Sequence, residues 1–251
     1  MWQHPGALRT SATPPIEDDA EDVHWTLALA GGEGVRLTEY VERRFGKRIP
    51  KQYCNLLGKR SMLEHTLDRL NTLTPASRTI TVIGTHHSEF ADPQLAGRSD
   101  HVFRQPSARD TGLALYVALA MIKRWNPNAV VTITPTDHYV APASKYIERV
   151  RVAQSVAEHM RDKVVILGVE PTEADPELGY LSLGPNLAEV PEVRQLIGFV
   201  EKPSVPAAQD LREKGALWNT MVTCGSVDAL WELGRKAEPQ LLDILDSLVP
   251  L

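Results

Sequence analysis

Residues 25–37 read Trp-Thr-Leu-Ala-Leu-Ala-Gly-Gly-Glu-Gly-Val-Arg-Leu, an apolar run followed by three glycines within four positions. The run is too short for an independent helix and is bounded by glycine, so Thr26–Ala30 is predicted to be a buried strand. Gly31, Gly32 and Gly34 lack Cβ atoms. The backbone there can turn sharply, and its consecutive N–H groups can form an anion-binding concavity.

Arg36 follows the glycines and adds a permanent cation with several hydrogen-bond donors, which suits a phosphate group. Two well-known phosphate loops do not match this spacing. The dinucleotide-binding pattern requires a third glycine where Leu37 stands, and the P-loop requires a Gly-Lys-Ser/Thr sequence that is absent. The residues alone therefore fit either another kind of phosphate loop or a tight strand-to-helix turn with a surface arginine.

The composition bounds the class of protein. The chain has 251 residues, 43% of them hydrophobic, which is enough for one large domain. Residues 1–24 hold five acids and one base, which leaves 27 acids and 26 bases elsewhere. Such a neutral body makes a nucleic-acid partner unexpected. No stretch is long enough to span a membrane, and Cys54 and Cys224 lack metal-like spacing, so we expect reduced thiols and a cytoplasmic location.

The rest of the chain alternates strand and helix patterns. Residues 1–22 are expected to form a disordered acidic leader, and residues 23–251 a single domain. Strands are predicted at 79–83, 129–134, 164–169, 180–183, 193–200 and 217–223. Helices are predicted from a Ser61–Glu64 capping box onward and at 111–123, 144–160, 206–214, 227–233 and 239–248. Segment 39–48 is predicted to be an irregular, exposed insertion. This alternation favours an α/β fold with a mainly parallel sheet flanked by helices.

The glycine loop, the Asp137 turn and the Glu170–Pro171 loop each follow a predicted strand, so all three should open on the carboxyl edge where such sheets bind ligands. Asp137 lies in a turn, where a carboxylate either holds a divalent cation against phosphate oxygens or stabilises its own turn. Glu201 and Lys202 stand at a strand end, where they could meet a hydroxyl and an anion or form an exposed charged pair. Lys51 reads by default as a solvated lysine. Asn219 either presents its amide to a hydroxyl or is a hydrogen-bonded residue beside a buried tryptophan.

Taken in order, seven segments resemble the sugar-phosphate nucleotidyltransferase family, most closely its mannose-1-phosphate guanylyltransferase branch. They are Leu-Ala-Gly-Gly-Glu-Gly-Val-Arg-Leu (29–37), Pro-Lys-Gln-Tyr (50–53), Arg-Asp-Thr-Gly (109–112), Pro-Thr-Asp-His (135–138), Glu-Leu-Gly-Tyr (177–180), Phe-Val-Glu-Lys-Pro (199–203) and Leu-Trp-Asn (217–219). The resemblance covers roughly residues 25–235. It implies a Rossmann-like fold of the nucleotide-diphospho-sugar transferase type.

The resemblance also implies roles at the nucleotide. The glycine loop and Arg36 would hold a nucleoside triphosphate, with Lys51 at its phosphates and Thr111 at the start of a helix beside it. Asp137 would bind Mg²⁺ that bridges the reacting phosphates. The expected triphosphate is GTP.

At the other substrate, the resemblance implies that Lys202 neutralises a sugar 1-phosphate, expected to be mannose 1-phosphate. Glu201, Asn219 and the Gly179 backbone would hold sugar hydroxyls. Two alternatives stay open, namely the same fold acting on another hexose 1-phosphate or nucleotide, and a non-catalytic nucleotide-sugar-binding regulatory module. A homo-oligomer also stays open.

The sequence departs from the family pattern at several positions. Val35 stands where the family usually has Thr, and Asp110 replaces the usual Asn. The family's second metal-binding Asp belongs to a segment beyond the late helices, and Asp243 and Asp246 do not match that motif. The expectation is therefore either a domain truncated at its C-terminus or one that lacks full metal coordination.

Overall fold

The computed structural model describes residues 23–34, 37–56, 58–106 and 111–248. Its strands are β1 (His24–Ala30), β2 (Thr79–Gly84), β3 (His101–Gln105), β4 (Val130–Pro135), β5 (Val164–Val169), β6 (Tyr180–Asn186), β7 (Arg194–Val200) and β8 (Leu217–Ser226). The α-helices are α1 (Thr38–Phe45), α2 (Met62–Leu70), α3 (Ser88–Leu95), α4 (Thr111–Trp125), α5 (Ala143–His159), α6 (Val205–Glu213), α7 (Val227–Ala237) and α8 (Pro239–Leu248). Short 3₁₀ helices are η2 (Lys51–Tyr53), η3 (Ala76–Arg78) and η4 (Thr85–His87). Among these helices, none is both long and apolar enough to cross a membrane.

The sheet is parallel in its core. Its strand order is β3-β2-β1-β4-β8-β6-β7, and β5 pairs with β8. Strands β3, β2, β1 and β4 are parallel, whereas β8 runs antiparallel to β4, β5 and β6, and β6 is antiparallel to β7. The predicted α/β fold is confirmed. The antiparallel part was not predicted. The short 187–193 connection explains why β6 and β7 are antiparallel, because a parallel crossover needs a dozen or more residues.

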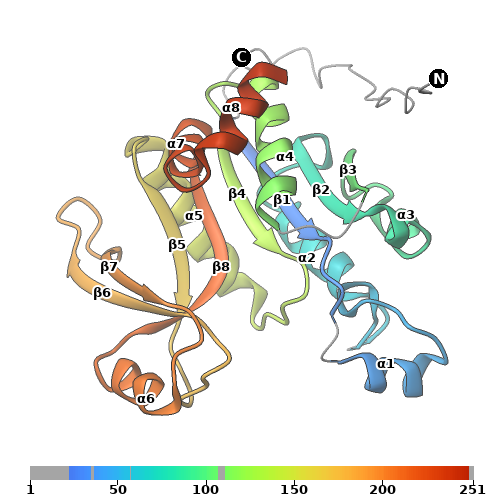
Figure 1. Cartoon of the computed structure of the whole chain (residues 1–251), viewed down its shortest axis with the longest axis horizontal. Coiled ribbons are helices and arrows are strands. Elements are labelled where there is room, and N and C mark those ends of the chain that lie inside the picture. Colours follow the sequence, from blue (N-terminus) through green and yellow to red (C-terminus); the bar gives the residue numbers. More distant parts are fainter. Residues whose placement is uncertain (1–22, 35–36, 57, 107–110, 249–251) are drawn as a thin grey trace.

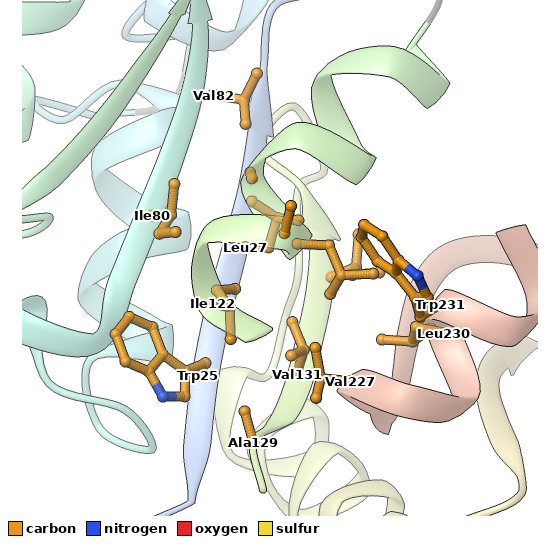
Figure 2. Close-up of a cluster of buried hydrophobic side chains, with 14 of the residues drawn as sticks. Trp25, Leu27, Ile80, Val82, Ile122, Ala129, Val131, Val227, Leu230 and Trp231 are labelled. Atoms are coloured by element: carbon orange, nitrogen blue, oxygen red, sulfur yellow. The ribbon is translucent and has the colours of Figure 1, made fainter. Parts of the chain in front are cut away.

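Alternate residues of the central strands face opposite helical layers. Leu27 of β1 belongs to a core cluster formed with α4, α7 and α8, whereas the next residue, Ala28, packs with α2 and α3. Figure 2 shows the first cluster, where Ile122 of α4 and Trp231 of α7 lie near Leu27. A strand buried on both faces has no polar face to display, which is why its sequence reads as a continuous apolar run.

The second half of the sheet carries its own helices. Helix α5 packs through Val150 and Ala153 on β4, β5 and β8. Helix α6 packs through Ala208 on Tyr180 of β6. Figure 1 shows β6, β7 and α6 at one side of the molecule and α1 at the other. The carboxyl edge of the parallel core lies between these two outlying parts.

The sequence predicted an irregular, exposed segment at 39–48. The segment is exposed, but it is not irregular, because residues 39–45 form most of helix α1. Only Val41 of this helix is buried, so its charged side chains stay in solvent. The helix ends at Gly46, whose φ of 71° is left-handed and whose N–H donates to the Glu42 carbonyl. Charged residues are good helix formers, and a glycine just past the end is a stop signal. The irregular segment was predicted from its charge alone, without the stop signal at Gly46.

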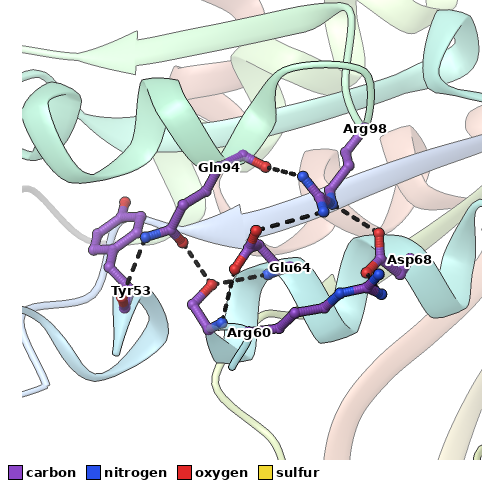
Figure 3. Close-up of polar contacts among 7 residues, drawn as sticks. Tyr53, Arg60, Glu64, Asp68, Gln94 and Arg98 are labelled. Atoms are coloured by element: carbon purple, nitrogen blue, oxygen red, sulfur yellow. Dashed lines mark hydrogen bonds and ion pairs between the residues drawn. The ribbon is translucent and has the colours of Figure 1, made fainter. Parts of the chain in front are cut away.

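A polar network fixes α2 against α3 and η2 (Figure 3). The Ser61 side chain accepts from the Glu64 N–H at 3.1 Å, and the Glu64 carboxylate accepts from the Ser61 N–H at 2.9 Å, so the predicted capping box is confirmed. Arg98 pairs with Glu64 at 3.4 Å. Gln94 donates to the Tyr53 carbonyl at 3.2 Å. The network holds the 3₁₀ helix that begins at Lys51.

Candidate active site

The carboxyl ends of β1 and β4 bring the glycine loop (residues 31–34) and Asp137 side by side. The two strands are parallel neighbours, and Leu29 lies opposite Pro135 in their register. The Thr136 hydroxyl donates to the Leu29 carbonyl at 2.9 Å, which ties the turn after β4 to the end of β1. Strand β5 runs in the same direction as β4, because both are antiparallel to β8. The loops after all three strands therefore open at one edge, as predicted.

The glycine loop rests on two buried side chains of η2. The Gln52 amide donates to the carbonyls of Ala30 at 2.8 Å and Gly32 at 2.7 Å, and the Tyr53 hydroxyl also donates to Ala30 at 2.7 Å. Gln52 is only 3% exposed. All three bonds are accepted by carbonyl oxygens, so they fix the loop without using its N–H groups. Those N–H groups are the ones that could bind an anion. This support was not predicted from the sequence, where only the adjacent Lys51 stood out.

Gly34 lets the loop approach Lys51 closely. Its φ is +63°, and a Cβ added there would lie 2.9 Å from the Lys51 backbone nitrogen, so only glycine fits. The Lys51 Nζ lies 3.3 Å from Asp137 Oδ2. The two side chains are 30% and 42% exposed, which leaves both accessible to a ligand. The structure thus places Lys51, predicted at the phosphates, in an ion pair with Asp137, predicted to bind the metal.

Lys51 and Asp137 line a cleft of about 1,090 Å³ that also reaches Trp218, Asn219 and Thr220 of β8. The charged lining comprises six cations, Lys51, Arg69, Lys145, Arg149, Lys163 and Arg194, and two carboxylates, Asp137 and Glu192. The whole chain carries a net charge of −5. Most of the other lining residues are apolar, and Lys51 and Arg149 pair with the two carboxylates, but the remaining cations favour anionic ligands.

Arg69 is a cleft residue that the sequence analysis missed. It is 9% exposed, its guanidinium lies 4.8 Å from the Tyr146 ring centre, and it donates to Thr66 at 3.2 Å. Its Nε has no hydrogen-bond partner, and among the described residues no carboxylate pairs with it. Burial, with Lys51 and Arg69 nearby, lowers the pKa of His138, although Asp137 acts in the opposite direction. A buried arginine without an anion is unusual, and it supplies fixed positive charge.

The residues predicted at the sugar form a second group. The Asn219 N–H donates to the Gly179 carbonyl at 2.8 Å. The Asn219 Oδ1 accepts from the Met221 N–H at 2.8 Å, so the side-chain NH₂ is the group left to donate. A Cβ on Gly179 would lie 2.6 Å from Glu201 Oε2, so glycine brings the backbone against this carboxylate. The structure therefore brings Gly179, Glu201 and Asn219 together.

Lys202 turns away from β7 directly after Glu201. Its φ is 45°, a left-handed conformation that is uncommon for a residue with a side chain. Both residues are exposed, and they do not belong to the cleft lining given above. Lys202 has no ion-pair partner within the described parts of the chain. Its ammonium group is therefore available to an anion that approaches this end of the site.

The remaining residues singled out from the sequence are not described at the site or are buried away from it. Arg36 lies outside the described residues, and Thr111 begins α4, but the structure does not describe its side chain. Cys54 and Cys224 are buried free thiols. Burial raises the pKa of Cys224 to about 12, so this thiol cannot serve as a nucleophile near neutral pH.

Two relatives with similar sequences are named mannose-1-phosphate guanylyltransferase. One from Escherichia coli is 28% identical over 230 residues, which cover 89% of this chain and 48% of the relative. One from Salmonella montevideo is 30% identical over 202 residues, which cover 77% of this chain and 41% of the relative. The chain thus spans less than half the length of these two relatives.

A solved structure and a family model agree with these relatives. The crystal structure of a mannose-1-phosphate geranyltransferase from Thermus thermophilus has a TM-score of 0.80 and 30% identity, over 91% of this chain and 65% of that chain. The family model described as nucleotidyl transferase matches residues 26–250, which include the glycine loop, Asp137 and Asn219. The chain therefore belongs to the nucleotidyl transferase family.

Proposed function

We propose that this protein transfers a nucleotidyl group from GTP to mannose 1-phosphate and releases pyrophosphate. The observation that carries the proposal is the Lys51–Asp137 pair, 3.3 Å apart beside the glycine loop and open to a cationic cleft. A cation next to a carboxylate suits a triphosphate and the divalent ion that accompanies it. The choice of GTP and mannose 1-phosphate follows the names of the relatives, and the assay below tests it.

Asp137 is the residue that would hold Mg²⁺. Its carboxylate is accessible and lies at the end of β4, next to the predicted phosphate loop. Mg²⁺ is usually bound by one or two carboxylates together with substrate phosphates and water, so a single open carboxylate fits. When bound, the ion would supply positive charge to the reacting phosphates.

The chain's own residues would then position the nucleotide. The N–H groups of Gly31 and Gly32 would face its phosphates, since Gln52 holds the loop by its carbonyls. Lys51 would add a mobile cation, Arg69 would add a fixed one, and Arg36 is predicted to add a third. Positive charge arranged before the reaction stabilises the charge that develops at the transferred phosphoryl group.

At the sugar, the Asn219 amide and the Glu201 carboxylate would bind hydroxyls, one as donor and the other as acceptor. The Gly179 backbone would lie against the sugar, and Lys202 would neutralise its phosphate. A phosphate oxygen of the sugar 1-phosphate attacks the α-phosphorus in line. A new P–O bond forms, the bond from the α-phosphorus to the bridging oxygen breaks, and pyrophosphate leaves. Such chemistry depends on positioning and charge neutralisation and needs no protein nucleophile.

The test is pyrophosphate release by the purified chain with Mg²⁺, mannose 1-phosphate and each nucleoside triphosphate in turn. Release is expected with GTP, and Asp137→Ala should abolish it. Asp228→Ala is the matched control, because Asp228 pairs with Lys123 on the surface at 2.8 Å and lies outside the site. Release that is equal in both variants would refute the role of Asp137.

The same assay separates the alternatives. Release with another triphosphate or another hexose 1-phosphate would keep the reaction and change the specificity. No release from any triphosphate by a folded chain would overturn the catalytic proposal. GDP-mannose binding by calorimetry would then support the non-catalytic binding module.

A further inference from the structure

A second group of chemistry-bearing side chains lies beside the glycine loop. Glu33 belongs to the loop itself, and His86 and His87 belong to η4, which directly follows β2. Strand β1 has β4 as its parallel neighbour on one side and β2 on the other. The two histidines and Asp137 therefore flank the glycine loop from opposite sides.

The three side chains converge on one point. The Glu33 Oε1 lies 2.8 Å from His86 Nε2, and Oε2 lies 3.6 Å from His87 Nε2. One ligand atom from each residue lies within 4.8 Å of the others. The two imidazole rings are 4.0 Å apart at their centres. Ligand atoms of a tetrahedral zinc ion lie about 3.3 Å apart, so on binding the 2.8 Å contact would lengthen and the wider spacings would contract.

The burial of His87 supports a ligand at this point. The residue is 2% exposed, and within the described residues neither ring nitrogen makes a hydrogen bond of 3.5 Å or less, although Nε2 lies 3.6 Å from Glu33 Oε2. A buried polar group without a partner is rare and costs free energy, so it calls for an explanation. The Tyr53 ring packs edge-on against it at 5.4 Å, which holds the imidazole in place. A metal bond to a ring nitrogen would satisfy the group that protein contacts leave unsatisfied.

The site is open on the other side. The Glu33 and His86 side chains are 46% and 50% exposed, so an ion can enter and keep a water molecule. Gly84 makes room for the rings, because a Cβ there would lie 2.7 Å from His86 Cε1. Three protein ligands with an open position are the usual arrangement of an accessible zinc site, whereas a structural site is closed by four.

We propose that Glu33, His86 and His87 bind a divalent transition-metal ion of the zinc class. The donor set distinguishes this site from Asp137, since imidazole suits zinc, cobalt and nickel, whereas Mg²⁺ prefers oxygen ligands. The bound ion would fasten Glu33, and with it the glycine loop, to η4. The proposal does not rest on the proposed reaction, because it concerns residues on the other side of the loop.

The test is titration of the tag-free, chelator-treated full chain with Zn²⁺ by calorimetry and with Co²⁺ by visible absorption. One equivalent is expected to bind, and the Co²⁺ complex should show the d–d bands of a low-coordinate nitrogen and oxygen site. Glu33→Gln and His86→Ala are the main variants, because both positions are exposed and should tolerate the change. Even outer-shell changes weaken metal sites roughly 10- to 100-fold, so each variant should raise Kd at least about tenfold.

Two controls give the result a clear meaning. His65→Ala removes an exposed histidine of α2 outside the cluster, so Zn²⁺ affinity should not change. Asp137→Ala should also keep Zn²⁺ binding, which separates this site from the one proposed for Mg²⁺. Unchanged affinity in Glu33→Gln and His86→Ala, or an equal loss in His65→Ala, would overturn the proposal.

Discussion

Gly34→Ala is expected to weaken both folding and catalysis, because two separate penalties meet at this residue. Gly34 has φ of +63°, a conformation that costs an alanine about 1 kcal/mol. The added Cβ would also lie 2.9 Å from the Lys51 backbone nitrogen, and overpacking of this kind costs about 1–3 kcal/mol. The unfolding free energy should therefore fall by about 2–4 kcal/mol.

Gly215→Ala is the matched control. Its φ is +76°, but a Cβ there would have no atom within 4 Å, so only the conformational penalty of about 1 kcal/mol applies. Urea unfolding of both variants and the parent measures the two losses. Their difference isolates the contact between the loop and Lys51, because the backbone strain is common to both.

Turnover gives the second measurement. The Lys51 backbone can relieve the contact only by moving, and a misplacement near 1 Å can lower a rate about 100-fold. Pyrophosphate release should therefore fall by about that factor in Gly34→Ala and stay near the parental rate in Gly215→Ala. Equal destabilisation of the two variants, or full turnover in Gly34→Ala, would refute the reasoning.

Three further predictions follow from individual contacts. Ser61→Ala removes the acceptor of the Glu64 N–H and should lower the unfolding free energy by about 1 kcal/mol in urea, whereas an unchanged midpoint would show that the cap contributes nothing. Lys202→Ala should slow pyrophosphate release about 10²- to 10³-fold, and a near-normal rate in a folded variant would remove it from the site. Burial lowers the pKa of His87 and His138 in the folded chain. As pH falls, the unfolded chain therefore takes up protons at a higher pH than the folded chain, and the unfolding free energy should decrease below about pH 6.5. Thermal melts should show a shallower pH slope in His138→Gln, and an identical slope would contradict this origin.

The parallel core could be predicted because burial leaves a plain mark on the sequence. Strand β4 is buried along its whole length, and the apolar run at 129–134 predicted it to within a residue. Helix α2 was predicted from its capping box, a local signal that does not depend on the rest of the fold. Both features are determined by residues close to one another in the chain.

Other elements were missed because tertiary packing outweighs their local signal. Strand β3 (His101–Gln105) pairs only with β2, and its one buried residue is Gln105, so it shows little apolar pattern. Helix α3 contains Pro93, which argues against a helix in any local interpretation. The position of Arg69 in the cleft depends on how α2 packs beside α5, and neither helix encodes that alone.

The order of the chain predicted which loops share an edge, and only the structure shows that they meet there. Lys51 and Asp137 are 86 positions apart in the sequence. Their contact requires the glycine loop to pack closely against η2, which Gly34 allows because it has no Cβ. The same loop carries Glu33 toward two histidines on its other side. One backbone segment thus connects the Lys51–Asp137 pair with the cluster of Glu33, His86 and His87. An ion bound by Glu33 in the proposed metal site would also restrict Gly34, and through it Lys51, the cation proposed to meet the triphosphate.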